Sequence, residues 1–370
     1  MPSPTLAAKG PAMRIGGILR RLGTALLFLI ILLLLAPVVV PPFLDRIYYR
    51  GPISVHYDGK RFANQDGDAF SPQQMQPVRM LRFFSGQARA AWPDHVAVTP
   101  GHPVPRVEGT GMTATWIGHS TVLVQAGGIN ILTDPVYAER AGPWGILGPR
   151  RVREPGVRFD DLPKIDLILV SHDHYDHMDV PTLKRLWARD HPMIVTSLGN
   201  DSVIGLPAAT RDWGGKVEVR PGITVTIERV HHWGSRWMAD RDRALWSGFS
   251  VTLPGGNLFF AGDTGWGDGS WPIAAAKDGP YRLAILPIGA FVPRDLMASN
   301  HIGPVEAVDA FRRLGASYGL AVHWGTFRLS SEAIGDPPAL LRATVAKRGI
   351  SPERFRALEV GQPWSVPALH

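Results

Sequence analysis

The 370-residue sequence predicts a layered α/β fold with mixed β-sheets, preceded by one membrane-spanning helix. Two observations support this prediction. From about residue 107 onward, short strand-like runs separated by turns alternate with helical segments. Before them, one long stretch of the chain is almost purely apolar. The 40 Gly and 33 Pro residues favour a loop-rich fold over a helical bundle.

The N-terminal part divides into a basic segment, residues 1–21, and an uncharged segment, residues 22–44. The uncharged segment exceeds the roughly 20 apolar residues that a membrane span requires. The cations that precede it are Lys9, Arg14, Arg20 and Arg21. By the positive-inside rule we expect a cytoplasmic N-terminus, a signal anchor in the bacterial inner membrane, and the remaining chain on the periplasmic side. The alternative is a cleaved signal peptide.

Three prolines, Pro37, Pro41 and Pro42, predict that this helix ends near the outer face of the membrane. The region that follows, residues 45–106, is Pro-rich at 71–77 and 93–105, with a short helix expected over 78–92. It is interpreted as an extension that either covers the membrane-facing side of the catalytic domain or merely connects it. We place the catalytic domain at residues 107–370.

Charge and cysteine content exclude some classes of function. The net charge is +7, and four of these charges come from the first 44 residues, so the rest carries too little excess charge for a nucleic-acid-binding stripe. The chain contains no Cys. Any metal must therefore be bound by His and carboxylate ligands.

The expected elements of the catalytic domain follow one another from residue 113. A hairpin turn at Gly127 and Gly128 separates two of the strands. Strands are expected at 113–117, 120–124, 129–133, 165–170, 193–197, 216–219, 224–230, 248–253, 257–261, 283–287 and 318–322. Helices are expected at 180–190, 304–314 and 337–348.

The main chemical signal follows the apolar strand 165–170. His172 and His174 are two residues apart, so on an extended segment both side chains point the same way and can converge on one cation. Asp176 and His177 follow in a turn and can bind a second cation nearby. Burying four such groups together without a cation would be costly.

Four ligands do not complete two sites, so further ligands are expected at the ends of later strands. His232 follows the strand 224–230, Asp263 follows 257–261, and His323 follows 318–322. Each lies at a strand end, where ligands from separate strands can converge. His231, beside His232, is expected to be a bystander.

With these residues, the pattern resembles the metallo-β-lactamase fold superfamily. Further blocks resemble, within it, N-acyl-phosphatidylethanolamine-hydrolysing phospholipase D and its bacterial relatives. The resemblance spans roughly residues 107–365 in order, through the blocks 116–122, 132–135, 148–151, 171–179, 232–233, 260–265, 287–290 with 293–294, and 323–327.

The resemblance implies an αββα sandwich of two mixed sheets with a dinuclear metal site at one edge. It assigns His172, His174 and His232 to one cation, Asp176, His177 and His323 to the other, and Asp263 to both. Two Zn²⁺ ions are expected, and other divalent transition metals also suit such ligands. The implied reaction is attack on phosphorus by a hydroxide that bridges the metals, with a phospholipid as substrate and the membrane as partner.

Several nearby residues receive secondary roles. Tyr175 is a candidate substrate contact, and Asp176 and Asp263 are candidates for handling protons. By resemblance, His301 is a catalytic candidate that lines the phosphate pocket, where an imidazolium could hydrogen-bond a phosphoryl oxygen. Asp134 and His119 are expected to orient metal ligands rather than to bind metal.

The competing functions are hydrolysis of another ester, lactone or amide at the same metal site, a nuclease of the same fold, and a non-catalytic envelope protein. No nucleic-acid partner is expected, and the sequence carries no sign of a particular oligomeric state. The complete ligand set favours an enzyme, because a scaffold protein requires none of it.

Overall fold

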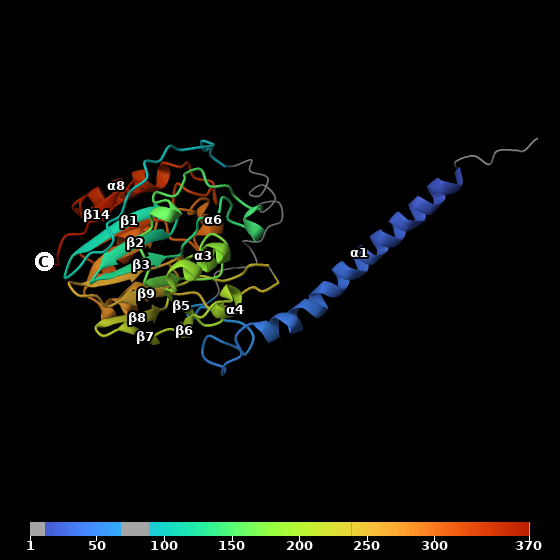
Figure 1. The fold of residues 1–370 in the computed structure, drawn as a ribbon, viewed down its shortest axis with the longest axis horizontal. Helices are drawn as coiled ribbons and strands as arrows, with labels where there is room; N and C mark the ends of the chain where they lie inside the picture. The colour runs from blue at the N-terminus through green and yellow to red at the C-terminus, as the bar shows by residue number, and fades with distance from the viewer. Residues whose placement is uncertain (1–11, 68–88, 238, 370) are drawn as a thin grey trace, which may run out of the picture. The chain divides into compact units, whose positions relative to one another are not determined.

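The computed structural model describes residues 12–67, 89–237 and 239–369, and it divides into two units that are treated separately here. The first unit, Met1–Ile47, contains the helix α1. The second unit, Tyr48–His370, contains all the strands and the remaining helices of the described residues (Figure 1).

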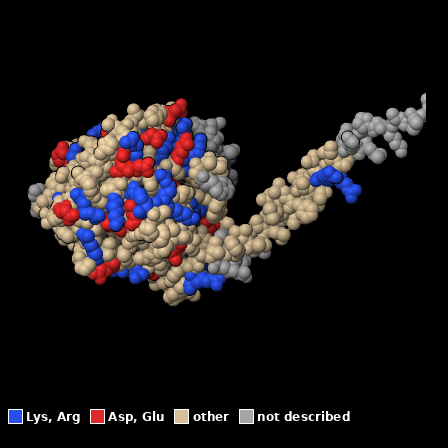
Figure 2. Space-filling model, in the orientation of Figure 1, with Lys and Arg blue, Asp and Glu red and all other residues tan. Residues whose placement is uncertain are grey.

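Helix α1 spans Ala12–Ile47, and within it Gly16–Ala36 is long and apolar enough to cross a membrane. None of this stretch is buried, and Figure 2 shows tan side chains along most of the helix with blue ones near one end. The helix continues past Pro37, Pro41 and Pro42, so the prediction that it ends at these prolines is wrong. Apolar helices tolerate proline when the freed carbonyl groups find other donors. Length and composition suit both an anchor and a signal sequence.

The second unit is built from two seven-stranded mixed sheets (Figure 1). The first sheet has the order β14-β1-β2-β3-β4-β5-β6, with β1 Met112–Gly118, β2 Thr121–Ala126, β3 Ile129–Thr133, β4 Leu167–Val170, β5 Met193–Ser197, β6 Ala209–Arg211 and β14 Pro363–Ser365. The second has the order β13-β12-β11-β10-β9-β8-β7, with β7 Lys216–Arg220, β8 Ile223–Glu228, β9 Gly248–Val251, β10 Asn257–Phe260, β11 Tyr281–Pro287, β12 Tyr318–Val322 and β13 Phe355–Arg356.

The alternating direction of the side chains along each strand explains this layering. In β4, Leu167 and Leu169 belong to the core shared with the second sheet, whereas Ile168 and Val170 pack on the other face against α3, Val180–Asp190. Successive side chains of a strand point to opposite faces, so a strand that is apolar throughout must be covered on both sides. The fold is therefore the predicted sandwich, with two sheets inside and helices outside.

Helices cover both outer faces. α3 and α4, Asn200–Ile204, contact each other, and α4 also lies against β5 and β6. α7, Pro304–Leu314, packs on β11 and against α5, Trp271–Ala275, and α8, Asp336–Lys347. The described residues also contain the short helix α6, Arg294–Met297, and 3-10 turns at Pro143–Gly145, Phe159–Asp161 and Ala276–Asp278. β6, β13, β14 and the short helices were not predicted, because they lack a full period of hydrophobic repeat.

The compact unit that contains the strands begins at Tyr48, before residue 107, where the catalytic domain was placed from the sequence. Residues 48–67 pack into this unit through Tyr57 and Phe62. Residues 71–77 and most of the expected helix 78–92 lie outside the described residues, and residues 89–92 are not helical. The stretch 93–106 is irregular, as expected, and Arg106 ties it to the sheet through Asp166 at 2.7 Å.

Strand direction brings the chemically important residues to one edge. β3 and β4 are parallel, and so are β10, β11 and β12. β8 runs in the same direction as β10, because both pair antiparallel with β9. The carboxyl ends of these strands, followed by Asp134, His172, His232, Asp263 and His323, therefore lie at one edge of the sandwich.

A fractionation experiment tests the role of α1. We expect the full chain to sediment with membranes and to require detergent, because its exposed apolar side chains belong mostly to α1. A chain that starts at Tyr48 should instead appear in the soluble fraction. Recovery of the full-length protein without detergent, or a mature N-terminus near residue 40, would contradict the anchor.

Candidate metal centre

All seven residues predicted as ligands come together at the common strand edge. The structure groups His172, His174 and His232, and separately Asp176, His177 and His323 with His119, in sets whose ligand atoms lie within 4.8 Å of one another. Asp263 is close to both groups, since it clusters with His172 and His177 and also with His301 and His323.

In the first group, His172 and His174 contact each other, and hydrogen bonds from outside the group hold His172 and His232 in position. His172 Nε2 lies 2.9 Å from His174 Nδ1, and His172 Nδ1 lies 2.8 Å from the hydroxyl of Ser171. His232 Nδ1 lies 2.9 Å from the main-chain oxygen of Asn300, which leaves Nε2 pointing into the centre. A histidine ligand commonly donates its second N–H to such a partner, which fixes its tautomer.

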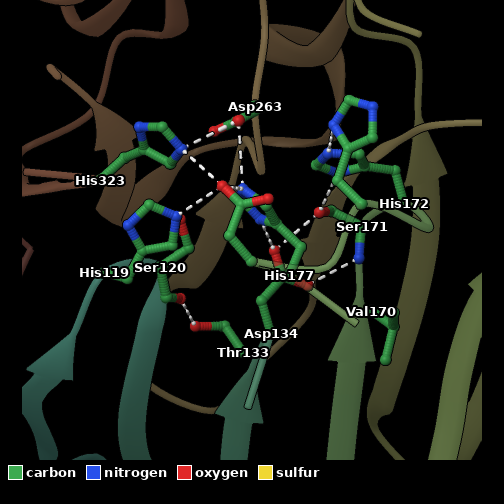
Figure 3. Close-up of polar contacts among 12 residues, drawn as sticks. His119, Ser120, Thr133, Asp134, Val170, Ser171, His172, His177, Asp263 and His323 are labelled. Atoms are coloured by element: carbon green, nitrogen blue, oxygen red, sulfur yellow. Dashed lines mark hydrogen bonds and ion pairs between the residues drawn. The ribbon is translucent and has the colours of Figure 1, made fainter. Parts of the chain in front are cut away.

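The second group surrounds the Asp263 carboxylate (Figure 3). Asp263 Oδ2 is 3.1 Å from His177 Nε2 and 3.0 Å from His323 Nε2. Asp176 Oδ2 lies 3.6 Å from each of the same two nitrogens. Two carboxylates and two imidazoles thus point at one small volume from three separate segments of the chain.

Asp134 orients His177 from behind, as the sequence predicts. Its Oδ2 atom lies 2.7 Å from His177 Nδ1 and also accepts the Ser171 hydroxyl, while Oδ1 accepts the Ser171 amide (Figure 3). Asp134 and His177 are both completely buried. This single carboxylate therefore fixes a ligand of the second group directly and His172 of the first through Ser171.

His119 orients Asp176 in a comparable way. Its Nε2 atom lies 3.0 Å from Asp176 Oδ2, and its main chain is held by the Thr326 hydroxyl and the His323 amide. The burial of His119 and the adjacent His323 lower its pKa to about 3, so the ring is neutral and donates a hydrogen bond to the carboxylate. The orienting role expected for His119 fits this geometry.

Four of the six described non-glycine residues with positive φ lie at the same edge, and the other two are His191 and Asp242. The four are His119, Asp134, Ala290 and His323, with φ values of 52°, 31°, 57° and 63°. Non-glycine residues in this left-handed region cost about 1–3 kcal/mol each, and they persist where the surroundings hold them in place. Three of the four carry the side chains that form or orient the centre.

Burial keeps the first group neutral. Burial, with neighbouring imidazoles, lowers the pKa values of His172 and His232 well below the usual value, and burial lowers the pKa of His174 to about 4. Neutral imidazoles offer their lone pairs to a cation without first losing a proton.

The second group is charged in the cation-free protein. Burial opposes protonation of His177 and His323, but Asp263 and Asp176 outweigh it, so the pKa of His323 rises to about 9 and that of His177 rises well above its usual value. Burial would raise the pKa values of Asp176 and Asp263, but the histidines hold both well below the usual value. Protons on the two histidines thus balance the negative charge of the two carboxylates, which bound cations would otherwise balance.

The donor set fits divalent cations. His232 Nε2 and Asp263 Oδ1 are buried and lack a hydrogen-bond partner among the described residues, and His177 Nε2 and His323 Nε2 face only the Asp176 and Asp263 carboxylates. A buried polar group without a partner costs about 1–3 kcal/mol, so a cation that all of these atoms share would stabilise the cluster. Nitrogen and carboxylate ligands suit Zn²⁺ and other divalent transition metals.

The remaining candidates lie beside this centre. Tyr175 lines a cavity of about 240 Å³, and the Arg236 guanidinium lies 3.9 Å from the centre of its ring. His301 Nδ1 is 3.6 Å from Asp263 Oδ2. Burial lowers the pKa of His301 to about 4, so at neutral pH it is a neutral donor rather than the imidazolium considered from the sequence.

Three contributors were not foreseen from the sequence. Ser171 bridges Asp134 and His172, the main-chain oxygen of Asn300 holds His232, and Asn64 binds the His232 main chain. Ser171 lies inside the recognised motif and could have been found there. Asn64 lies in a segment that carries no motif, and no sequence signal points to it.

Residues 129–324 match the family model described as the Beta-lactamase superfamily domain. That stretch contains every one of the seven converging side chains. The chain belongs to the β-lactamase superfamily. Together with the His and Asp clusters, this membership makes it a metal-dependent hydrolase with a metallo-β-lactamase fold.

Two curated relatives are similar over most of the catalytic unit. The chain is 35% identical over 272 residues to N-acyl-phosphatidylethanolamine-hydrolyzing phospholipase D 1 of Caenorhabditis elegans, covering 70% of this chain and 76% of that protein. It is 32% identical over 262 residues to the mitochondrial N-acyl-phosphatidylethanolamine-hydrolyzing phospholipase D of Saccharomyces cerevisiae, covering 67% of this chain and 54% of that protein. Among solved structures, an isothiocyanate hydrolase from Delia radicum gut bacteria shares the fold, with a TM-score of 0.54, 19% identity, and coverage of 69% and 99%.

Metal affinity of the superfamily member should depend on pH. In the cation-free protein, His323 has a pKa of about 9 and therefore holds a proton at neutral pH that a cation must displace. Raising the pH removes this proton and strengthens binding, and lowering the pH weakens binding by about tenfold per pH unit for each displaced proton. Competition titrations with Zn²⁺ at several pH values below 9 measure this slope. An affinity that does not change with pH would contradict the charge assignment.

Loss of the Asp134 carboxylate should weaken the centre without removing a ligand. In Asp134→Asn, His177 loses its charged acceptor, so we expect metal affinity to fall by about 10–100-fold and stability by about 1–3 kcal/mol. Zn²⁺ titration and chemical denaturation measure the two effects. The matched control is Asp190→Asn, a buried carboxylate that accepts the Ile165 amide away from the centre. Equal zinc affinities in the two variants would refute the orienting role of Asp134.

Proposed function

We propose that the chain is a membrane-anchored phosphodiesterase of phospholipase D type that hydrolyses N-acyl-phosphatidylethanolamine or a similar phospholipid. The observation that carries this proposal is 35% identity over 272 residues to a protein named for that reaction. The candidate membrane span at Gly16–Ala36 supports it, because an anchor keeps the catalytic unit close to lipid.

The seven converging side chains are the proposed metal ligands. His172, His174 and His232 would hold one cation, and Asp176, His177, His323 and the shared Asp263 would hold the second. Two divalent cations held by these residues, Zn²⁺ in our proposal, would supply Lewis-acid polarisation of a phosphoryl oxygen and would lower the pKa of water towards neutrality. Asp134, Ser171 and His119 keep the ligands in a fixed orientation, which avoids reorganisation during the reaction.

Proton and charge handling falls to the side chains around the ligands. Asp176 and Asp263 remain ionised because their pKa values are held low, so neither acts as an acid, and both are weak proton acceptors. His301 is neutral and half-buried at the rim, where its N–H can donate to a phosphoryl oxygen of the substrate. We assign His301 to substrate binding on this basis.

The cavity beside Tyr175 suits part of a phospholipid. Its lining combines aromatic and apolar groups, including Tyr137 and Met178, with the guanidinium groups of Arg185 and Arg236. Trp237 packs edge-on to Tyr175 and is 51% exposed. Apolar surface next to cationic groups matches the acyl chains and the phosphate of a lipid.

An activity screen with the full-length protein in detergent micelles tests the proposal. We expect the release of phosphatidic acid from N-acyl-phosphatidylethanolamine, and its abolition by a chelator. The comparison substrates are bis(p-nitrophenyl) phosphate, lactones and β-lactams. Hydrolysis of lactones or amides without phosphodiester hydrolysis would refute the phospholipid substrate and favour the alternative hydrolase. Absence of turnover with every substrate would favour a non-catalytic envelope protein.

Ligand variants test the role of the metal. His172→Ala should lower activity by more than the roughly 10–100-fold that loss of an orienting partner typically costs. The control is His102→Ala, because the His102 side chain is 71% exposed and lies in the irregular stretch before the first strand. Unchanged activity in His172→Ala would remove the metal mechanism.

A further inference from the structure

The segment that follows α1 is part of the catalytic unit, and residues 48–67 are called the strap here. Tyr57 and Phe62 of the strap are 2% and 3% exposed and belong to the main hydrophobic core. The Phe62 amide donates to the main-chain oxygen of Asp242 at 2.7 Å. The strap is therefore anchored firmly enough to position polar side chains.

Asn64 of the strap binds both main-chain polar groups of His232. Its Nδ2 donates to the His232 oxygen at 2.8 Å, and its Oδ1 accepts the His232 amide at 3.2 Å. Oδ1 also accepts the indole N–H of Trp246 at 3.0 Å. The Asn64 side chain, on a residue only 8% exposed, thus holds the backbone of a proposed metal ligand through two hydrogen bonds and is itself held by a third from Trp246.

Asp66 extends the same contact to the neighbouring loop. Its Oδ1 lies 2.8 Å from His231 Nδ1, and its Oδ2 accepts the Asp268 amide at 2.9 Å. A Cβ atom at Gly267 would lie 2.0 Å from Asp66 Oδ2, so the loop approaches the strap too closely for any larger residue. His231 is buried through this pairing and acts as a link between strap and loop.

The ligand loop depends on such contacts because it lies beyond regular structure. β8 ends at Glu228, four residues before His232, and the only β-bridge that the described part of this loop makes is the isolated one between His231 and Gly265. The imidazole of His232 is held by the Asn300 oxygen on one side, and its backbone is held by Asn64 on the other. Both contacts are needed to aim Nε2 at His172 and His174.

We propose that Asn64 is a positioning residue of the metal centre and that the strap completes the site formed by His172, His174 and His232. This inference rests on the metal centre of the proposed function, but it does not depend on the substrate. Removing the Asn64 amide should lower the affinity of one cation and leave the other, held by Asp176, His177 and His323, nearly unchanged.

The test compares two buried asparagines in the full-length protein. Asn130 also makes three side-chain hydrogen bonds, to Gln125 and to the main-chain oxygens of Pro105 and Lys164, but it lies at the start of β3, away from the centre. Zn²⁺ affinities are measured by competition with a chromophoric chelator. Asn64→Ala should weaken one of two zinc ions by about 10–100-fold, as loss of an outer partner typically does, and Asn130→Ala should weaken neither.

Thermal unfolding with and without Zn²⁺ separates positioning from a general loss of stability. Both variants should unfold at a lower temperature than the wild type without metal, but only Asn64→Ala should also lose part of the upward shift that zinc produces. Zinc affinities equal to the wild type in Asn64→Ala, or equally reduced in both variants, would overturn the proposal.

A second variant covers the case in which Asn64→Ala does not fold. Asn64→Asp keeps the acceptor for the His232 amide and for Trp246, but it replaces the donor to the His232 oxygen with a second oxygen. Its zinc affinity should also fall at one site, and an unchanged affinity would overturn the proposal. A wild-type protein that binds no zinc would instead refute the metal centre itself, whichever substrate is hydrolysed.

Discussion

The Asp134 carboxylate, buried at the end of β3, is the contact on which the rest of the centre depends. It accepts the Ser171 amide and hydroxyl, which fixes the end of β4, and it lies 2.7 Å from His177 Nδ1. One side chain thus joins two strands and orients a ligand. A buried carboxylate is stable there only because each of its oxygens has a partner. The positive φ of Asp134 indicates that the surrounding structure holds the residue in a strained conformation for this purpose.

The arrangement of the two sheets brings the remaining side chains of the site next to Asp134 and His177. Strands of both sheets that run in one direction end at a common edge, where no further strand residues compete for the space. His323, which follows β12, can therefore lie close to His177, which follows β4, although the two residues are 146 positions apart in the sequence. The carboxylates of Asp176 and Asp263 hold these imidazoles together, and cations or protons balance the charge. The proposed lipid reaction would use this charge balance, with the cavity beside Tyr175 as the proposed surface for the substrate.

The structure shows contacts of residues 48–67 that the sequence does not indicate. As sequence, residues 45–106 indicate only an extension, either a cover or a connector. In the fold, residues 48–67 enter the core through Tyr57 and Phe62 and reach the ligand loop through Asn64 and Asp66. The chain that leaves the candidate membrane helix thus becomes part of the wall of the metal centre.

The sequence by itself determined the layered α/β fold, most strands, the three longer helices of the catalytic unit and all seven converging side chains. Local signals suffice for these, because strand periodicity and the spacing of His172, His174, Asp176 and His177 are properties of short segments. Only the tertiary structure decided the partners of those residues: Asp134 behind His177, His119 behind Asp176, and Asn64 behind His232. It also decided that the catalytic unit begins at Tyr48. Such contacts join segments far apart in the chain, and a hydrogen bond between distant segments leaves no periodic or spaced pattern in a single sequence.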